Sequence, residues 1–294
     1  MKLAIGCHVS IAGGVFNAPK NAADLACETF QIFSRSPRGG PAAKLTGDII
    51  AQFQAEMKKY NLDTFVIHCP YYINFGSSNP RIYHGSSAVI REELERGSSL
   101  GANYVMTHLG SAKDLGQEKA FKQAKEGLTK VLKGYEGQTQ FLLEIAAGAG
   151  EVIGGSFEQL AELMKPLVKF KAFGGICFDT QHAFASGYDL RDNEAVASTF
   201  KKFDKIIGLK WLKMSHINDS KVELGERKDR HEHIGEGLIG EKGFEAILGF
   251  LHKNPKSAIL NPKSVVFPLI LETEHDKVKA DIKILKILRN KVSK

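Results

Sequence analysis

The sequence has few cysteines and no long apolar run, and each absence argues against a class of protein. The four cysteines, Cys7, Cys27, Cys69 and Cys177, are scattered through 294 residues without a CxxC spacing. Scattered thiols of this kind favour reduced cysteines in a cytoplasmic protein over a disulfide framework. The first residues, Met1–His8, lack the apolar region of a signal peptide and are predicted to form a strand. No segment is apolar enough to suggest a membrane span.

The sequence also lacks an interdomain linker and low-complexity tracts, and its composition is that of a globular protein. Hydrophobic residues make up 43% of the chain and charged residues 25%, which argues against disorder. Residues 1–294 are therefore expected to form a single domain. The net charge of +7 is compatible with a polyanionic partner such as nucleic acid, and equally with a solvated basic surface. Two Asn-Pro-Lys-Ser segments, 254–257 and 261–264, are typical of turns.

Eight strand-like runs alternate with helical patterns. The runs are Leu3–Ser10, Thr29–Phe33, Thr64–Cys69, Asn103–Leu109, Gln140–Ile145, Gly175–Asp179, Trp211–Asn218 and Val265–Thr273. The helical patterns include Asp48–Tyr60, Ser87–Leu100, Gln117–Lys133, Ser156–Lys169, Asn193–Ile207, Gly243–Lys253 and Asp276–Val292. Strand and helix alternation indicates a parallel sheet, and eight such units close a (β/α)8 TIM barrel. An open, doubly wound α/β sheet is the alternative.

Histidines and carboxylates recur where these runs end. Six run ends carry His68, His108, Glu144, Asp179, His216 and Glu272, and the segments that follow add His182, Asp229 and His231. The carboxyl ends of the strands of a barrel converge on one mouth, so these side chains are predicted to meet there. Buried charged groups are costly unless a cation compensates them, although a satisfied polar residue is the simpler interpretation of any single histidine. Nine donors without thiolate predict two or three ions of zinc, manganese or iron.

Several metal ions at one mouth favour one reaction class. They would clamp a phosphate group and activate water, so the predicted reaction is hydrolysis of a phosphate ester. The other five histidines are not expected to bind metal; they are His8, His84, His233, His252 and His275. His8 and His233 are the two of these that lie nearest to the pattern. Function is expected to reside in the long loops Pro70–Gly85, Ala146–Gly155 and Asp219–Gly240.

Three motifs resemble the signatures of the endonuclease IV family of apurinic/apyrimidinic DNA endonucleases. They are His68-Cys-Pro-Tyr71-Tyr-Ile-Asn74, Gly175-Ile-Cys-Phe-Asp179-Thr-Gln-His182, and His216-Ile-Asn-Asp-Ser-Lys221 continuing to Asp229-Arg-His231. The resemblance extends from Gly6-Cys-His8-Val-Ser10 to Leu271-Glu272-Thr273. It implies a monomer that acts on double-stranded DNA containing abasic sites.

The resemblance also implies three zinc ions, or manganese in place of one of them. The first ion would be held by His68, His108 and Glu144. Glu144 would bridge to a second ion on Asp179, His216 and Glu272, and the third would be held by His182, Asp229 and His231. Catalytic roles fall on Glu144 and Glu272. A metal-bound hydroxide would cleave the phosphodiester 5′ to an abasic site, leaving a 3′-hydroxyl and a 5′-deoxyribose phosphate.

The same resemblance implies contacts with DNA. Arg38 and Tyr71 would insert into a bent duplex, and Lys221 and Arg230 would contact phosphates, as would Arg227 and Lys228. An arginine after Pro37 or a tyrosine beside another tyrosine is otherwise an ordinary surface residue, and a basic loop is often only solvated.

The chain departs from the family pattern at a few positions, namely Gly39, Gly40, Ala149, Gln181, Glu226 and Glu274. None of these is a predicted ligand, so zinc binding and chemistry are expected to persist while the insertion into DNA differs. A metal-dependent sugar isomerase of the same barrel class and a non-catalytic DNA-binding relative are the alternative functions.

Overall fold

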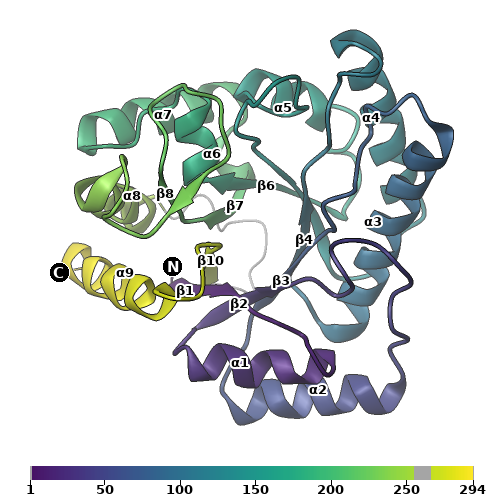
Figure 1. Ribbon diagram of the computed structural model, residues 1–294, viewed down its shortest axis with the longest axis horizontal. Coiled ribbons are helices and arrows are strands. Elements are labelled where there is room, and N and C mark those ends of the chain that lie inside the picture. The colour runs from purple at the N-terminus through teal and green to yellow at the C-terminus, as the bar shows by residue number, and fades with distance from the viewer. Residues whose placement is uncertain (1, 255–265, 294) are drawn as a thin grey trace.

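The strands form a closed parallel barrel in the computed structural model, which describes residues 2–254 and 266–293. The barrel consists of β1 Lys2–His8, β2 Thr29–Ile32, β3 Phe65–His68, β4 Tyr104–Thr107, β5 Gln140–Glu144, β6 Phe173–Asp179, β7 Leu212–His216 and β10 Val266–Leu271. Each strand pairs with the next along the chain, and β10 closes the barrel against β1. Figure 1 shows these strands surrounded by a ring of helices. The TIM barrel prediction is confirmed, and the open sheet is excluded.

All eight predicted runs correspond to barrel strands. Most of them end one or two residues earlier than predicted; the run Asn103–Leu109, for example, contains β4 Tyr104–Thr107. Val265, the first residue of the last predicted run, and the Asn-Pro-Lys-Ser segments beyond Asn254 lie outside the described residues.

The helices follow the predicted patterns with two corrections. They are η1 Val15–Asn17, α1 Ala18–Asp24, α2 Gly47–Lys59, α3 Pro80–Leu100, α4 Gln117–Leu132, α5 Phe157–Met164, α6 Thr180–Ala185, α7 Asn193–Ile206, η2 Leu209–Trp211, α8 Gly240–Lys253 and α9 Val278–Val292. Helix α3 begins well before Ser87, because Asn79 accepts a hydrogen bond from the amide of Arg81 and Pro80 suits a first helical turn. Helix α5 ends before Lys169, because Pro166 has no amide hydrogen with which to continue the helical hydrogen bonds.

Helix α9 shows how the outer ring is attached to the barrel. Its apolar residues Val278, Ile282, Leu285 and Leu288 are buried. At its end, Arg289 donates hydrogen bonds to the carbonyl of Leu3 and to the Glu28 carboxylate. The helix therefore ties β1 to the segment that enters β2.

The interior of the barrel holds a separate apolar cluster, formed by Val66, Tyr104, Met106, Leu142, Cys177, Met214 and Ile270. All four cysteines are buried and free, as the scattered spacing predicts, although the sulfur atoms of Cys7 and Cys27 lie 3.6 Å apart. Among the described helices, none has both the length and the apolar character needed to cross a membrane.

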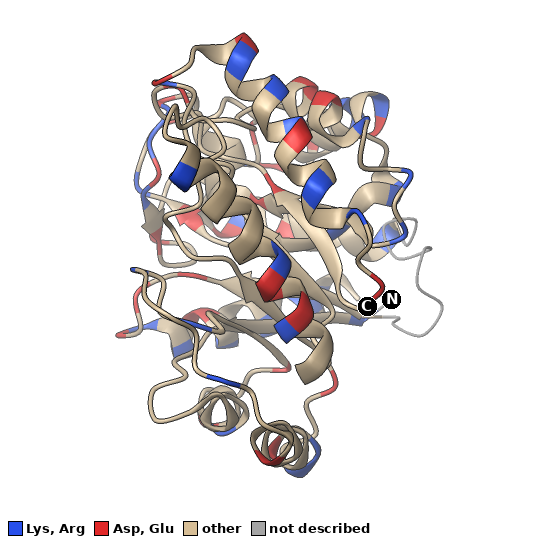
Figure 2. Ribbon diagram, turned by 90° about the vertical axis from the view of Figure 1, so that its right-hand side faces the viewer, with Lys and Arg blue, Asp and Glu red and all other residues tan. Residues whose placement is uncertain are grey.

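The excess of positive charge is not gathered on the face of Figure 2. In that view, acidic and basic residues are interspersed along the outer helices. Such a face has the appearance of an ordinary solvated surface and shows no basic patch.

Candidate metal centre

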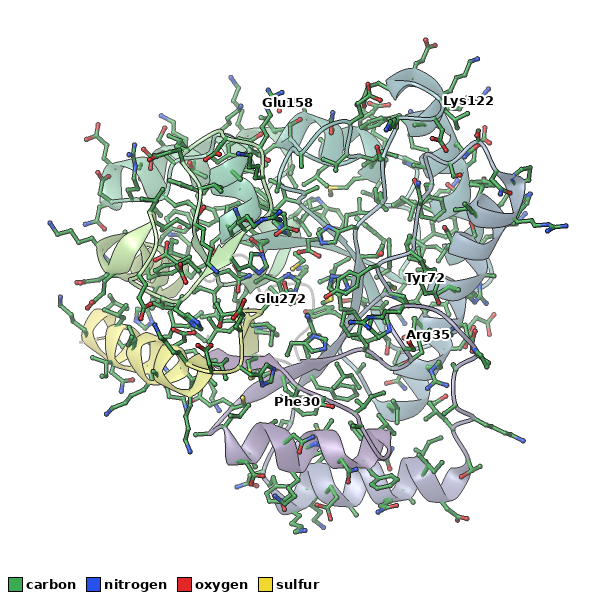
Figure 3. The ribbon with its side chains drawn as sticks, in the orientation of Figure 1. Phe30, Arg35, Tyr72, Lys122, Glu158 and Glu272 are labelled. Carbon is green, nitrogen blue, oxygen red and sulfur yellow. The ribbon has the colours of Figure 1, made fainter. Side chains whose placement is uncertain are left out.

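The strands deliver four of the nine predicted ligands as their last residues. His68, Glu144, Asp179 and His216 end β3, β5, β6 and β7, while His108 and Glu272 directly follow β4 and β10. His182 lies in the short helix α6, one turn after Asp179. Asp229 and His231 come from the loop in which β8 Asp219–Ser220 pairs with β9 His231–Glu232. Figure 3 shows Glu272 projecting toward the middle of the barrel, whereas Lys122 and Glu158 lie on the outer ring.

Glu144 lies at the centre of two donor groups. Its Oε2 is 3.3 Å from His68 Nε2 and 3.5 Å from His108 Nε2. Its Oε1 is 2.7 Å from His216 Nδ1, and that nitrogen is 3.3 Å from Glu272 Oε2. Oε2 of Glu144 therefore faces the first group, with His68 and His108. Oε1 faces the second group, which consists of His216, Glu272 and Asp179.

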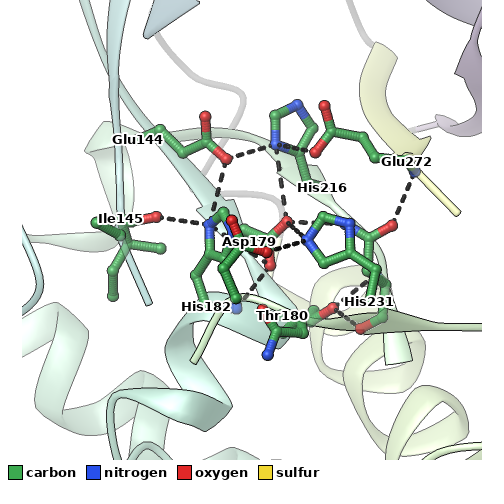
Figure 4. Close-up of polar contacts among 12 residues, drawn as sticks. Glu144, Ile145, Asp179, Thr180, His182, His216, His231 and Glu272 are labelled. Carbon is green, nitrogen blue, oxygen red and sulfur yellow. Dashed lines mark hydrogen bonds and ion pairs between the residues drawn. The ribbon is translucent and has the colours of Figure 1, made fainter. Parts of the chain in front are cut away.

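A third group lies beside the first two (Figure 4). Asp179, His182 and His231 can present one donor atom each within 4.8 Å of one another. Asp229 stands at the outer side of this group, with carboxylate oxygens 3.4 Å from His182 Nε2 and 3.5 Å from His231 Nε2. The fold thus brings together all nine side chains, whose sequence positions span residues 68–272.

Backbone carbonyls fix the orientation of two of the rings. Nδ1 of His68 is 2.6 Å from the carbonyl oxygen of Cys69, and Nδ1 of His182 is 3.0 Å from that of Ile145. A carbonyl accepts but cannot donate, so each Nδ1 carries a proton and Nε2 is the nitrogen left to bind a metal. These Nε2 atoms face Glu144 and Asp229, as metal ligands would.

Three buried polar atoms, each of which could bind a metal ion, have no hydrogen-bond partner. They are Glu144 Oε2, His182 Nε2 and His231 Nε2. A buried polar atom without a partner costs about 1–3 kcal/mol. One such atom lies in the first group and two in the third, so bound cations would satisfy all of them. Imidazole and carboxylate donors are ligands that zinc and manganese accept, and the residues present therefore fit a group of divalent ions.

In this site, burial and the attraction between opposite charges shift pKa values in opposite directions. Burial raises the pKa of Glu144, but His108 and His216 outweigh it and hold that pKa well below its usual range. Burial lowers the pKa of His182, but Asp179 and the neighbouring Asp229 raise it well above the usual value. Glu144 is thus held ionised, and positive charge on His182 offsets its charge. A divalent cation would supply that charge and displace the ring protons.

Two residues that the sequence analysis missed support the ligands. The fully buried Asn218 donates from Nδ2 to Asp179 Oδ2 at 2.8 Å, and its Oδ1 accepts from the amide of Glu272 at 2.8 Å. Gln31, on β2, contacts both His216 and Glu272. Asn218 stands in the third motif, so its sequence position offered a signal; Gln31 lies inside an ordinary strand pattern and offered none.

Two of the departures from the family pattern have structural roles near the third group. Nε2 of Gln181 donates to the carbonyl of Lys228 at 2.9 Å. Glu226 accepts from the amide of Glu223 and forms an ion pair with Lys228. Both contacts hold the segment that leads into Asp229. Lys228 is therefore engaged within its own loop.

His8 and His233 belong to none of the donor groups of the described residues. His8 contacts Gln31, and burial lowers its pKa to about 4, so this ring is neutral. His233 pairs with Asp281 and Asp276.

A cavity of about 510 Å³ opens beside the donor groups. His108, His182 and Asp229 form one side of it. The rest is largely apolar and comes from the segment 109–111 and from two of the predicted functional loops, through Tyr71, Tyr72, Ile73, Ile82, Ala146, Ala147, Ala149, Val152 and Ile153. Ala149, another departure from the family pattern, thus places a small apolar side chain in the wall.

The two loops predicted to insert into DNA lie next to each other. A Cβ atom on Gly39 would be 4.0 Å from the Tyr72 ring, and Tyr71 is 71% exposed with its ring packed against Phe33. Gly39 and Gly40 have φ angles of 116° and 94°, which L-residues rarely adopt. An aromatic side chain at either position would therefore require a different backbone. Arg38, Lys221 and Arg230 are exposed, and their contacts with DNA stay a prediction.

Comparisons with known proteins agree with this fold. A family model described as xylose isomerase-like TIM barrel matches residues 19–286. A protein of Nitrosopumilus maritimus (strain SCM1) named probable endonuclease 4 is 41% identical over 92% of this chain and 94% of its own length. The crystal structure of endonuclease IV from Thermus thermophilus superposes with a TM-score of 0.80 and 31% identity, covering 98% of this chain and 99% of that one.

A D-tagatose 3-epimerase-like structure has a TM-score of 0.74 at 20% identity, covering 99% of this chain and 98% of that one, so it shares the fold alone. The family match spans most of the chain, and the endonuclease IV relatives are alike from end to end. The chain therefore belongs to the endonuclease IV family of xylose isomerase-like TIM barrels.

Proposed function

We propose that this protein is a zinc-dependent apurinic/apyrimidinic endonuclease that hydrolyses the phosphodiester on the 5′ side of an abasic site in double-stranded DNA. The observation that carries the proposal is the convergence of nine donors with three unpartnered buried atoms, in a chain whose relatives are named endonuclease 4. The products would be a 3′-hydroxyl and a 5′-deoxyribose phosphate.

The chain's residues would hold three divalent ions. His68, His108 and Glu144 form the first set, and Glu144 is shared with the set of Asp179, His216 and Glu272. The third set consists of His182, Asp229 and His231. When bound, such ions stabilise the charge that develops on a phosphate and lower the pKa of water for attack near neutral pH. Glu144 and Glu272 are the carboxylates to which we assign catalytic roles, because both face the shared middle of the site.

The cavity beside the donors suits a nucleotide that has left the duplex. Its volume of about 510 Å³ is large enough for a small ligand, and one wall consists of candidate ligands. Extrusion is least costly where the base is already missing, so selectivity can arise from the deformability of the damaged site. Arg38 and Tyr71, on neighbouring exposed loops, would stabilise the bent duplex.

A sugar isomerase or epimerase is the second candidate, because such enzymes share this fold. The third donor set argues against it, since the loop that carries Asp229 and His231 adds ligands beyond those that one ion requires.

The test uses a duplex oligonucleotide with one tetrahydrofuran abasic analogue, which cannot undergo β-elimination. The full chain is assayed as purified, after removal of metal with a chelator, and after restoration of zinc, with an undamaged duplex of the same sequence as the control. We expect zinc-dependent incision immediately 5′ of the analogue, with ends that a polymerase extends. No incision by protein loaded with zinc would contradict the proposal and favour a sugar substrate or a DNA-binding role without catalysis.

A further inference from the structure

Gln31 makes three contacts at the mouth of the barrel, although its strand carries none of the predicted ligands. It is fully buried in β2. Its Nε2 donates to Glu272 Oε1 at 2.6 Å and lies 3.1 Å from His8 Nδ1. Its Oε1 lies 2.7 Å from His216 Nε2. One amide from β2 thus reaches side chains that extend from β1, β7 and the end of β10.

The partners leave the amide one orientation. A carboxylate accepts, so the nitrogen of Gln31 faces Glu272. The second hydrogen of that nitrogen points to Nδ1 of His8. The oxygen of Gln31 then has to accept from the remaining neighbour, Nε2 of His216, which must carry a proton.

This arrangement sets which nitrogen of His216 faces the ligand set. Gln31 engages Nε2, so Nδ1 is the nitrogen directed at the set, 2.7 Å from Glu144 Oε1 and 3.3 Å from Glu272 Oε2. Without a cation Nδ1 donates to Glu144, and a bound cation would take the place of that proton. The side-chain amide of Gln31 also donates a hydrogen bond to Glu272 Oε1, so Glu272 Oε2 remains directed at the shared centre. Gln31 therefore acts on two candidate ligands at once. Other ligands take their orientation from backbone carbonyls, as His68 does from Cys69.

We infer that Gln31 is a positioning residue that presents His216 Nδ1 and Glu272 Oε2 to the divalent cation shared by Glu144, Asp179, His216 and Glu272. The inference rests on the proposed function in one respect, namely that a cation occupies this set. Groups that orient metal ligands typically contribute about 10- to 100-fold to metal affinity. Gln31 should therefore control zinc retention in its own set and leave the set of His182, Asp229 and His231 unaffected.

The test measures zinc binding directly and does not depend on DNA cleavage. The full chain is stripped of metal, and zinc is titrated in competition with a chromogenic chelator; the ions retained after dialysis are counted by elemental analysis. For Gln31→Met, which keeps the length of the side chain without its hydrogen bonds, we expect one class of zinc to bind about 10- to 100-fold more weakly. The remaining zinc should bind as in the unsubstituted protein.

A matched control separates this effect from the general cost of losing a buried hydrogen bond. Thr139 is fully buried and donates to the carbonyl of Ala102 at 2.7 Å, at the start of β5 and away from the ligands. Thr139→Val should bind zinc as the unsubstituted protein does. Thermal unfolding in excess chelator, compared between Gln31→Met and Thr139→Val, shows whether each variant is folded without metal.

A second substitution separates the two halves of the amide. Gln31→Glu keeps an acceptor for His216 but replaces the donor that faces Glu272 with a second carboxylate, so weaker zinc binding is expected here too. Zinc binding of wild-type affinity and stoichiometry in either variant would overturn the inference and leave the proposed function standing. Failure of the unsubstituted protein to bind zinc would overturn both.

Discussion

Asp281, on the outer helix α9, accepts a hydrogen bond from the ring of His233 in the ligand-bearing loop, with 2.7 Å between Oδ2 and Nδ1. The same carboxylate accepts from the Thr273 hydroxyl at 2.9 Å and from the amide of Ile234 at 3.0 Å. Thr273 follows Glu272, and His233 lies two residues after His231. One buried carboxylate therefore ties together the two chain segments that deliver these donors.

We predict that Asp281→Asn loosens both segments. The substitution removes the charge and one acceptor from a group that is 1% exposed, at a cost of roughly 1–3 kcal/mol in the free energy of unfolding. Zinc retention against a chelator should fall as well. Asp204→Asn is the control, because Asp204 accepts from the amide of Leu209 on the outer ring, remote from the site. Equal zinc retention in the two variants would show that Asp281 has no positioning role.

Substitution of a predicted ligand should abolish activity without unfolding the chain. For Glu272→Gln and His231→Ala we expect turnover on abasic DNA to fall by orders of magnitude and zinc content to drop, because each change removes a donor. Circular dichroism should remain unchanged. Glu274→Gln and His252→Ala are matched controls that alter the same residue types outside the donor groups. Near-normal turnover in either ligand variant would refute the metal assignment.

Loss of the exposed Arg38 side chain should weaken DNA binding. Arg38→Ala is expected to raise the dissociation constant for abasic duplex, because the inserted side chain would stabilise the bent duplex. Lys122→Ala, which removes a charge from the outer ring (Figure 3), is the control. Unchanged DNA affinity of Arg38→Ala would count against the assignment of Arg38.

Arg96, on α3, supports the loop that contains Arg38. Its guanidinium donates to Ser34 Oγ, to the carbonyl of Ser34 and to the carbonyl of Ala43, each at 2.7 Å, so it holds both ends of the segment that contains Arg38. Arg96→Met should weaken DNA binding by about tenfold, which corresponds to about 1.4 kcal/mol, because a loop that is no longer held has to be ordered on binding. The turnover number at saturating DNA and the zinc content should stay unchanged.

Arg91→Met provides the comparison for Arg96. Arg91 also lies on α3 and also donates to backbone carbonyls, but those belong to Val131, Lys133 and Gly134 at the end of α4. Its loss should reduce stability without affecting DNA affinity. The same loss of affinity in both variants would show that the effect arises from α3 as a whole.

The attachment of α9 through Glu28 and Arg289 should make stability depend on pH. Burial raises the pKa of Glu28, but hydrogen bonds and charge from Arg289 outweigh burial and lower it below its usual value. A lowered pKa means that the contribution is complete above the unfolded value of about 4.3 and is lost as the pH falls through the folded value. Arg289→Met should therefore cost about 1–2 kcal/mol at pH 7, measured by urea unfolding, and less near pH 3. An equal cost at both pH values would contradict this.

Local sequence patterns predicted the fold well because each was strong by itself. The apolar runs such as Phe141–Glu144 and the stripe on α9 are buried as expected. The errors occurred at helical residues that stand outside a periodic pattern. Asn79-Pro80 began α3 inside a predicted loop, and the six residues of α6, buried throughout, carried no helical period of polar and apolar residues.

The sequence by itself determined the order of strands and helices, the ends of strands at which donors stand, and hence the TIM barrel with one candidate metal site. Only the tertiary structure decided which atoms face that site. Gln31 reaches His216 and Glu272, and Asp281 joins the loops that carry His231 and Glu272, because β10 closes against β1 and brings distant segments together. Hydrogen bonds between such segments depend on the register of the closed barrel, and no local periodicity in the chain records that register.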